Sequence, residues 1–362
     1  MIDKPEVISL AGGLPAPETF PAAALADAVT DILATDPGAL QYSTTEGYGP
    51  LREWVAARRG VDVDCVVITH GSQQGLDLVA RACVEPGAEV ALADPGYVGA
   101  IQALRLAGAR LAPVASDVDG LDVDALTDDL KRGARPALVY VVANFDNPTG
   151  ATLSLDRRRA LAALADRYGF VIVEDDPYGE LRWAGDALPG LAAFSDRVIT
   201  LGSVSKIVCP GLRIGYVIAP PALAQALVLV KQAVDLHTST LSQRAVHRVL
   251  TTPGFLTGQL DRLRPLYRER CVALTNALRE HLADRFEFAP PDGGMFVWGR
   301  FTDDVDTHEL LERAVEHGMA FVPGHAFAVA RDLRSSARLS FVTVTPDQLD
   351  EGVRRLAAAL AR

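Results

Sequence analysis

Residues 137–175 read ALVYVVANFDNPTGATLSLDRRRALAALADRYGFVIVED, and this stretch decides the fold class. Its two ends, 137–145 and 170–175, are short apolar runs rich in valine, a pattern typical of buried strands in a parallel sheet. Between them, residues 155–168 carry leucine and alanine at helical spacing, and Gly169 follows as a usual helix stop. The stretch therefore predicts a strand, a helix and a second strand.

Similar apolar runs recur along the first two thirds of the chain and alternate with amphipathic segments. In residues 73–84, for example, apolar side chains fall at positions i, i+3, i+4 and i+7. This alternation predicts an α/β domain with a mostly parallel sheet flanked by helices. The further runs are 66–69, 89–94, 198–201 and 214–219.

The pattern changes after about residue 221, where helical segments dominate and apolar stretches broken by glycine and proline follow. A final amphipathic helix is expected at 346–361. We therefore predict a large domain at residues 41–259. Residues 1–40 and 260–362 are expected to form a smaller α+β domain with an N-terminal arm.

Length and composition limit the class of protein. The chain has 362 residues, of which 49% are hydrophobic and 22% charged, so it can bury a large core and disorder is not expected. A net charge of −11 argues against a nucleic-acid partner, because phosphate backbones select basic surfaces. Local positive groups can still hold a small anion inside an acidic protein.

Cysteines and the N-terminus indicate the compartment. The four cysteines lie far apart without a CxxC pair, so we expect no metal site and reduced thiols. The start, MIDKPEVISLAGGLP, shows no signal peptide, and no stretch approaches the ~20 apolar residues of a membrane span. A cytoplasmic protein without membrane contact is predicted.

The segment GSVSK, 202–206, places a lysine just after a predicted strand. A lone lysine is usually a solvated surface charge. Lys206, however, lies among small and apolar residues at a strand end, where α/β proteins place ligand sites. Such surroundings lower a lysine pKa and make the amine nucleophilic. Ser203, Ser205 and Arg213 can together hold a phosphate.

Two further strand ends carry polar residues. The run VIVEDDPYGEL, 171–181, ends in three acids, which are either solvated or directed into the crevice at the carboxyl edge of the sheet. One carboxylate there can keep a pyridine nitrogen protonated. In ANFDNPTG, 143–150, the Asn147 amide can donate to a ring oxygen, although NPTG alone is only a turn signal.

Weaker candidates come from three other places. THGSQQGLDLV, 69–79, predicts a helix N-terminus suited to a phosphate, with Ser72 as its cap. Tyr97 can stack on a ring or simply pack in the core. Arg338 lies in a strand-like run, as either a solvated residue or a bidentate clamp for a carboxylate.

Taken in this order, the motifs resemble those of the fold-type I aminotransferases. The branch most similar contains α-aminoadipate and kynurenine aminotransferases and the effector domains of MocR-type regulators. The resemblance runs through SLAGGLP, LQYSTTEGYGPLR, NPTG, EDDPY, SxSK, GGMFVW, FVPGHAF and RLSF, and so covers nearly the whole chain. It implies a pyridoxal 5′-phosphate (PLP) enzyme that moves an amino group from an L-amino acid to a 2-oxo acid.

The resemblance also implies roles for residues. Lys206 matches the Schiff-base lysine that shuttles the substrate proton, and Asp175 matches the partner of the pyridine nitrogen. Asn147 and Tyr178 match the pair that binds the ring hydroxyl. Tyr97, counted with Lys206 and Asp175 as catalytic, matches the ring-stacking aromatic. Ser72, Gln73, Ser203, Ser205 and Arg213 match the phosphate cradle; Tyr42 matches a tyrosine that reaches the partner subunit of a homodimer; Arg338 matches the substrate-carboxylate arginine, with Asn147, Gly12 and Gly13 near the substrate.

Two other functions fit the same motifs. A lyase, cyclase or oxidase acting on an amino acid uses the same cofactor and differs only in the later steps. A ligand-sensing domain of a MocR-type regulator is disfavoured, because such regulators bind DNA and this chain is acidic.

Overall fold

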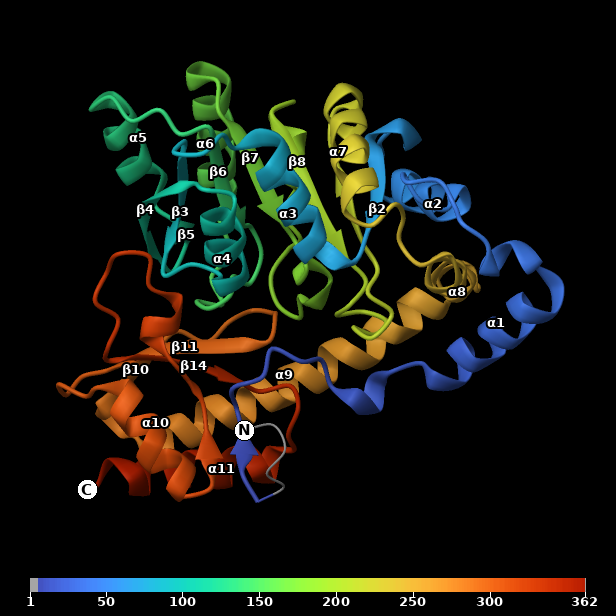
Figure 1. Ribbon diagram of the computed structural model, residues 1–362. Coiled ribbons are helices and arrows are strands. Elements are labelled where there is room, and N and C mark those ends of the chain that lie inside the picture. The colour runs from blue at the N-terminus through green and yellow to red at the C-terminus, as the bar shows by residue number, and fades with distance from the viewer. Residues whose placement is uncertain (1–5, 362) are drawn as a thin grey trace.

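An eight-stranded sheet forms the centre of the larger unit in the computed structural model, which describes residues 6–361 (Figure 1). Its strand order is β2-β9-β8-β7-β6-β3-β4-β5. β3, β4, β6, β7 and β8 pair in parallel, whereas β9 is antiparallel to both β2 and β8. The mostly parallel sheet is thus confirmed. The strands are β2 (Val66–Thr69), β3 (Glu89–Asp94), β4 (Arg110–Asp117), β5 (Gly120–Leu121), β6 (Leu138–Val142), β7 (Val171–Asp175), β8 (Val198–Ser203) and β9 (Gly215–Ile218).

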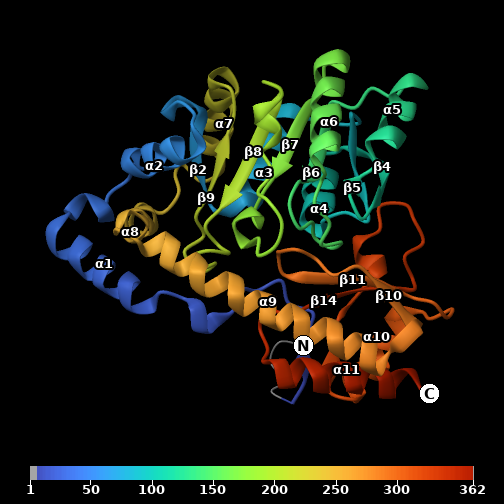
Figure 2. The same cartoon turned by 180° about the vertical axis from the view of Figure 1, so that it is seen from behind.

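Helices cover both faces of this sheet. Every residue of β2 and β6 is buried, as expected for strands covered on two sides. α3, α4 and α7 lie on the face seen in Figure 1, and α5 and α6 lie on the opposite face, seen in Figure 2. Their bounds are α3 (Gly71–Cys83), α4 (Val98–Leu106), α5 (Val123–Lys131), α6 (Leu155–Tyr168) and α7 (Pro221–Val234).

All six apolar runs are strands, and the helices predicted at 73–84 and 155–168 are α3 and α6. The strands β4 and β5 were not expected. β4 contains Pro113 and several exposed or half-buried residues, so it lacks the continuous apolar run of a central strand.

The direction of the strands fixes where polar segments meet. β2, β3, β6, β7 and β8 all point the same way, so their carboxyl ends lie at one edge of the sheet. The antiparallel β9 begins at that edge. The residues that follow these five strands therefore lie close to one another and to the residues that precede β9. This edge of the sheet is where α/β folds bind ligands.

The smaller unit is built from the C-terminal part of the chain and the first described residues. Its four-stranded antiparallel sheet has the order β10-β11-β14-β13, and β1 pairs in parallel with β12. α9 crosses below the large sheet and packs against α11 (Figure 1). The elements are β1 (Ile8–Ser9), α9 (Phe255–His281), β10 (Phe286–Phe288), β11 (Phe296–Phe301), α10 (Thr307–Glu316), β12 (Met319–Ala320), β13 (Val322–Pro323), β14 (Ser336–Ser340) and α11 (Pro346–Leu360).

Three further helices, α1, α2 and α8, meet at α8. α1 (Ala22–Thr35) and α2 (Gly49–Arg59) each contact α8 (Thr240–Thr251). The domain limits proposed at residues 40/41 and 259/260 stay a prediction, and residue 259 lies inside α9. Within residues 6–361, no helix has the length and apolar character needed to cross a membrane.

A fully buried arginine in α6 holds the segment that follows β6. Arg158 donates hydrogen bonds to the carbonyl oxygens of Leu153, Pro189 and Ala143 at 2.8, 3.0 and 2.7 Å. A fourth bond, of 2.8 Å, reaches Oδ1 of Asn144. The guanidinium thus replaces water for a loop that has no regular structure of its own.

We predict that Arg158→Met lowers the free energy of unfolding by about 3 kcal/mol, because three buried acceptors and one partly buried acceptor lose their donor. The neighbouring Arg159→Met changes an exposed arginine of the same helix and is expected to shift stability by less than about 0.5 kcal/mol. Urea unfolding of both variants measures the difference. Equal stability of the two would show that the Arg158 hydrogen bonds do not stabilise the fold.

Candidate active site

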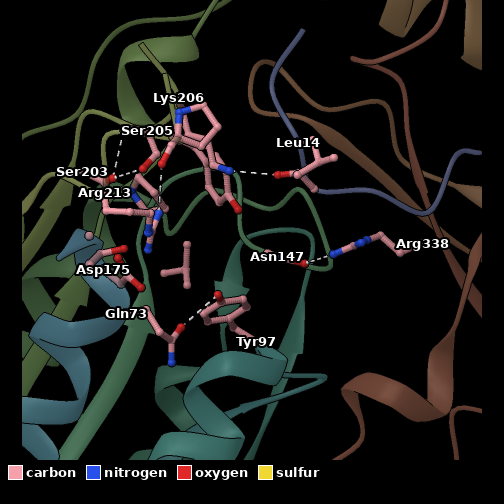
Figure 3. Close-up of a pocket in the computed structure, with 17 residues that line it drawn as sticks. Leu14, Gln73, Tyr97, Asn147, Asp175, Ser203, Ser205, Lys206, Arg213 and Arg338 are labelled. Carbon is pink, nitrogen blue, oxygen red and sulfur yellow. Dashed lines mark hydrogen bonds between the residues drawn. The ribbon is translucent and has the colours of Figure 1, made fainter. Parts of the chain in front are cut away.

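One cavity of about 390 Å³ lies at the carboxyl edge of the large sheet, facing the smaller unit (Figure 3). It brings together residues from the N-terminal segment, from the carboxyl ends of five strands of the larger unit (β2, β3, β6, β7 and β8) and from β14. The predicted residues that line it are Gly13, Ser72, Gln73, Tyr97, Asn147, Asp175, Tyr178, Ser203, Ser205, Lys206, Arg213 and Arg338.

Lys206 follows β8 and directs its amine into this cavity (Figure 3). Its Nζ donates a hydrogen bond of 2.9 Å to the carbonyl oxygen of Gly13. Burial, together with the nearby charges of Arg213 and Arg338, lowers the pKa of this amine to about 8. A neutral, nucleophilic amine is therefore available near neutral pH.

Asp175 is the last residue of β7 and is buried. Its Oδ2 accepts a hydrogen bond of 2.8 Å from the hydroxyl of Tyr140, whereas Oδ1 has no partner among residues 6–361. Burial, and secondarily the charges of Asp176 and Asp146, raises the pKa of Asp175 to about 7. A buried, unsatisfied carboxylate oxygen beside a cavity indicates a ligand that carries a donor.

One end of the cavity is suited to an anion. The positive end of the α3 dipole and the hydroxyls of Ser203 and Ser205 meet Arg213 there (Figure 3). Ser205 and Ser203 are linked through their Oγ atoms at 2.9 Å. A Cβ atom at Gly215 would lie 2.6 Å from the backbone nitrogen of Ser72, so glycine is needed for β9 to approach α3 this closely.

The prediction that Ser72 caps α3 is wrong. The helix begins at Gly71, its N-cap is His70, and no side-chain cap is present at that end. Ser72 is therefore inside the first turn. Gly71, Ser72 and Gln73 of that turn line the cavity, so its N–H groups, which have no side-chain cap, are available to an anion there.

Arg338 occupies the opposite end of the cavity. Its guanidinium lies between the rings of Phe296 and Phe327, with Cζ 4.3 and 5.0 Å from their centroids. Nη1 donates to Oδ1 of Asn147 at 2.7 Å, and Nη2 donates to the carbonyl oxygen of Ala11 at 2.6 Å. Burial lowers the pKa of Arg338 to about 10, which leaves it charged at neutral pH. Arg338 is buried, so the alternative of a solvated surface arginine is wrong.

Two tyrosines complete the walls. The Tyr97 hydroxyl donates to Oε1 of Gln73 at 3.2 Å, and Nε2 of Gln73 donates to the carbonyl oxygen of Gly99 at 3.0 Å. Tyr178 packs edge-on against Phe296, and burial raises its pKa well above the usual range. Both hydroxyls are therefore neutral at physiological pH.

Tyr42 and Gly12 do not line the cavity. Tyr42 is 78% exposed, and its ring contacts His237 at 5.7 Å. The lining contains residues that were not predicted: Leu14, Gly71, Val142, Pro177 and Pro210. Tyr140, which binds Asp175, was also missed, because a tyrosine inside an apolar strand gives the signal of a core residue.

The arrangement combines two anion-binding ends with an amine between them. The cavity lining contains three cations, Lys206, Arg213 and Arg338, in a protein of net charge −11. It can therefore hold a phosphate at the α3 end and a carboxylate at the Arg338 end. The amine of Lys206 lies between these two ends, where it can attack a carbonyl carbon or accept and donate a proton.

Known proteins match this chain over nearly its full length. The model of the family "Aminotransferase class I and II" matches residues 5–356. A 2-aminoadipate transaminase of Thermus thermophilus is 43% identical over 99% of this chain and 91% of the relative. Aromatic-amino-acid aminotransferase 1 of Thermococcus litoralis is 39% identical over 99% of this chain and 89% of its own length.

Solved structures agree with these relatives. The crystal structure of LysN, the α-aminoadipate aminotransferase of Thermus thermophilus, holds N-(5′-phosphopyridoxyl)-L-leucine; its TM-score is 0.94 at 43% identity, with 99% of this chain and 92% of that chain covered. A Pyrococcus horikoshii kynurenine aminotransferase with bound PMP has a TM-score of 0.94 at 38% identity, with the same coverage. Both are similar to this chain in fold and in sequence.

PLP fits the cavity that the residues form. The phosphate of PLP needs an anion site, its aldehyde needs a nucleophilic amine, and its pyridine nitrogen needs a carboxylate. The cavity contains all three. Oδ1 of Asp175, which has no partner within residues 6–361, would serve as the acceptor for a protonated pyridine nitrogen. The chain belongs to the class I and II aminotransferases, and it is a PLP-dependent enzyme that transfers amino groups.

Proposed function

We propose that Lys206 binds PLP covalently through Nζ and moves the proton at the Cα of the substrate. The observation that supports this role is a buried amine with a pKa of about 8, placed in one cavity with Asp175. Once the amine of the substrate has displaced Nζ from the cofactor, the neutral Lys206 amine can accept the Cα proton and return it from the ammonium form, so one side chain serves as base and acid.

The remaining cofactor contacts follow from the walls of the cavity. Ser72, Gln73, Ser203, Ser205 and Arg213 hold the phosphate at the N-terminal end of α3. Oδ1 of Asp175 would accept a hydrogen bond from the pyridine N–H and so keep that nitrogen protonated, Tyr97 would lie against the ring, and Asn147 and Tyr178 would bind the ring oxygen. When bound, PLP supplies an electron-withdrawing ring that stabilises negative charge at the substrate Cα.

Arg338 binds the α-carboxylate of each substrate, with Asn147 and Gly13 beside it. A fixed carboxylate orients the Cα–H bond toward Lys206, which converts binding energy into alignment. The substrates are an L-amino acid and a 2-oxo acid that use the same site in turn. Candidate donors are those for which the relatives are named, namely 2-aminoadipate, aromatic amino acids and kynurenine.

The alternative of a lyase, cyclase or oxidase has no support among the relatives described above, which are all named as aminotransferases or transaminases. Transfer of the amine to an added 2-oxo acid is therefore the expected outcome.

Localisation of the protein in the cytoplasm stays a prediction.

A homodimer is part of the proposal. Tyr42 lies outside the cavity of its own chain and close to the exposed Leu40, and its ring contacts His237, which follows the exposed Leu236. Exposed apolar residues grouped in this way favour an interface. In the dimer, Tyr42 reaches the phosphate of the cofactor in the partner subunit.

Lys206→Ala is expected to remove the visible absorption band of the bound cofactor and to lower kcat by at least about 10³-fold, because both the covalent link and the proton carrier are lost. Lys131→Ala, at an exposed lysine, is the matched control and should leave the spectrum and kcat unchanged. An intact visible band in Lys206→Ala would refute the assignment.

The rate at which the apoprotein takes up PLP should rise with pH and reach half of its maximum near pH 8. The lowered pKa of Lys206 means that the amine is mostly protonated below about 8 and mostly neutral above it. Stopped-flow absorbance between about pH 6.5 and 11 at about 0.15 M salt measures this rate. A midpoint near 10.5, the ordinary lysine value, would contradict it.

Sedimentation should give a particle of twice 38.6 kDa. Tyr42→Phe should preserve this dimer and weaken PLP binding by at least about tenfold, the effect of one lost hydrogen bond to a charged group. Equilibrium dialysis of PLP measures the second effect. A monomeric enzyme with full activity would exclude the shared site.

A further inference from the structure

One contact between the two units that the function above does not use is made by Asp94, the last residue of β3. Its Oδ1 accepts a hydrogen bond of 3.0 Å from the backbone N–H of Val329. Its Oδ2 accepts bonds of 2.8 Å from the backbone N–H groups of Ala330 and of Arg331. These donors are at least 235 positions away in the sequence, so the contact joins two distant segments.

Asp94 is completely buried, so its charge has no access to water. Three backbone N–H donors at short distance replace the lost hydration, and charge-assisted bonds of this kind are stronger than neutral ones. The guanidinium of Arg331 adds a bond of 3.2 Å to the carbonyl oxygen of Asp94. Asp94 does not line the active-site cavity, so it is not placed to touch a substrate or the cofactor.

The segment that Asp94 holds has no regular structure. Residues 328–331 lie between a single 3₁₀ turn, Gly324–Phe327, and the loop that leads into β14. A further bond ties this region to the larger unit, from the N–H of Gly96 to the carbonyl oxygen of Phe327 at 2.9 Å. Without Asp94, the three backbone N–H groups that it binds would lose their acceptor.

The held segment adjoins a ring that packs on the arginine of the active site. Phe327 is buried, with its ring against the guanidinium of Arg338 at 5.0 Å and against Trp298 at 5.7 Å. Phe327 precedes Val329 by only two residues. A shift of the Asp94 contacts would therefore move one of the two rings between which Arg338 is held.

We propose that Asp94 is a positioning residue for Arg338: by fixing residues 329–331 it holds the Phe327 ring against the guanidinium and so directs the donors of Arg338 at the carboxylate of the substrate. The inference rests on the proposed role of Arg338 as the carboxylate-binding residue. Arginine binds a carboxylate well only when its planar donors are aligned with the two oxygens, so a small rotation is enough to weaken binding.

The test compares Asp94→Asn with Asp332→Asn in the holoenzyme. The first substitution keeps the size of the side chain but turns an NH₂ group toward one or more of the backbone donors, so at least one bond is lost. Asp332 is the matched control, because it belongs to the same loop, is exposed and accepts only a local bond from the N–H of Arg334.

The probe is 3-phenylpropanoate, which has a carboxylate and no amine, titrated through its effect on the visible spectrum and on the rate. We expect Asp94→Asn to bind it about tenfold more weakly, with the KM of both substrates raised in proportion, while the PLP dissociation constant changes less than about twofold. Asp332→Asn should behave as the unaltered enzyme. A loss that affects PLP and the carboxylate equally, or neither, would overturn the inference.

A second variant tests the link through Phe327 and does not depend on the folding of Asp94→Asn. Phe327→Leu leaves the backbone contacts of Asp94 in place and should also weaken 3-phenylpropanoate binding selectively. The double variant should lose less than the product of the two single effects, because both act through the same ring. Independent, fully multiplicative effects would contradict the inference.

Arg338→Lys separates this inference from the function on which it rests. If Arg338→Lys binds 3-phenylpropanoate as tightly as the unaltered enzyme, the proposed role of Arg338 is wrong and the inference falls with it. If Arg338→Lys weakens the carboxylate and Asp94→Asn does not, only the role of Asp94 is wrong.

Discussion

Removal of Lys206, Asp175 and Arg338 from water within one cavity is the constraint on which this structure depends. Burial disfavours the charged form of each, as the lowered pKa values of Lys206 and Arg338 and the raised pKa of Asp175 show. The fold offsets this with partners from distant segments: the Gly13 and Ala11 carbonyls for the two cations and the Tyr140 hydroxyl for the acid. The same desolvation that opposes folding makes these groups reactive toward a charged ligand.

Topology makes this combination possible at little conformational expense. Each parallel strand ends at the same edge, so each contributes a short polar segment without any long excursion of the chain. The smaller unit closes the site by supplying Arg338 from β14, and the N-terminal segment passes between the two units. The active site therefore requires both units and cannot be ascribed to either alone.

The central strands and the residues that follow them could be predicted, because an apolar run followed directly by Asp175, Asn147 or Lys206 is a local signal. The strand β4, next to the last strand of the sheet, could not, since Pro113 and exposed residues interrupt its pattern. Contacts between distant segments gave no signal at all. Nothing near Asp94 in the sequence indicates that residues 329–331 bind it, and the hydroxyl of Tyr140 meets Asp175 only through strand pairing.

The position of Leu14 bears on how this enzyme can change during evolution. The segment around it contacts the cations of the site through the backbone oxygens of Ala11 and Gly13, so these contacts do not depend on which side chains the segment carries. Leu14 lines the cavity and is about half exposed. A substitution at position 14 would therefore change the wall of the cavity and leave these two backbone contacts in place, so selection can alter the shape of the cavity here separately from the groups that carry the chemistry.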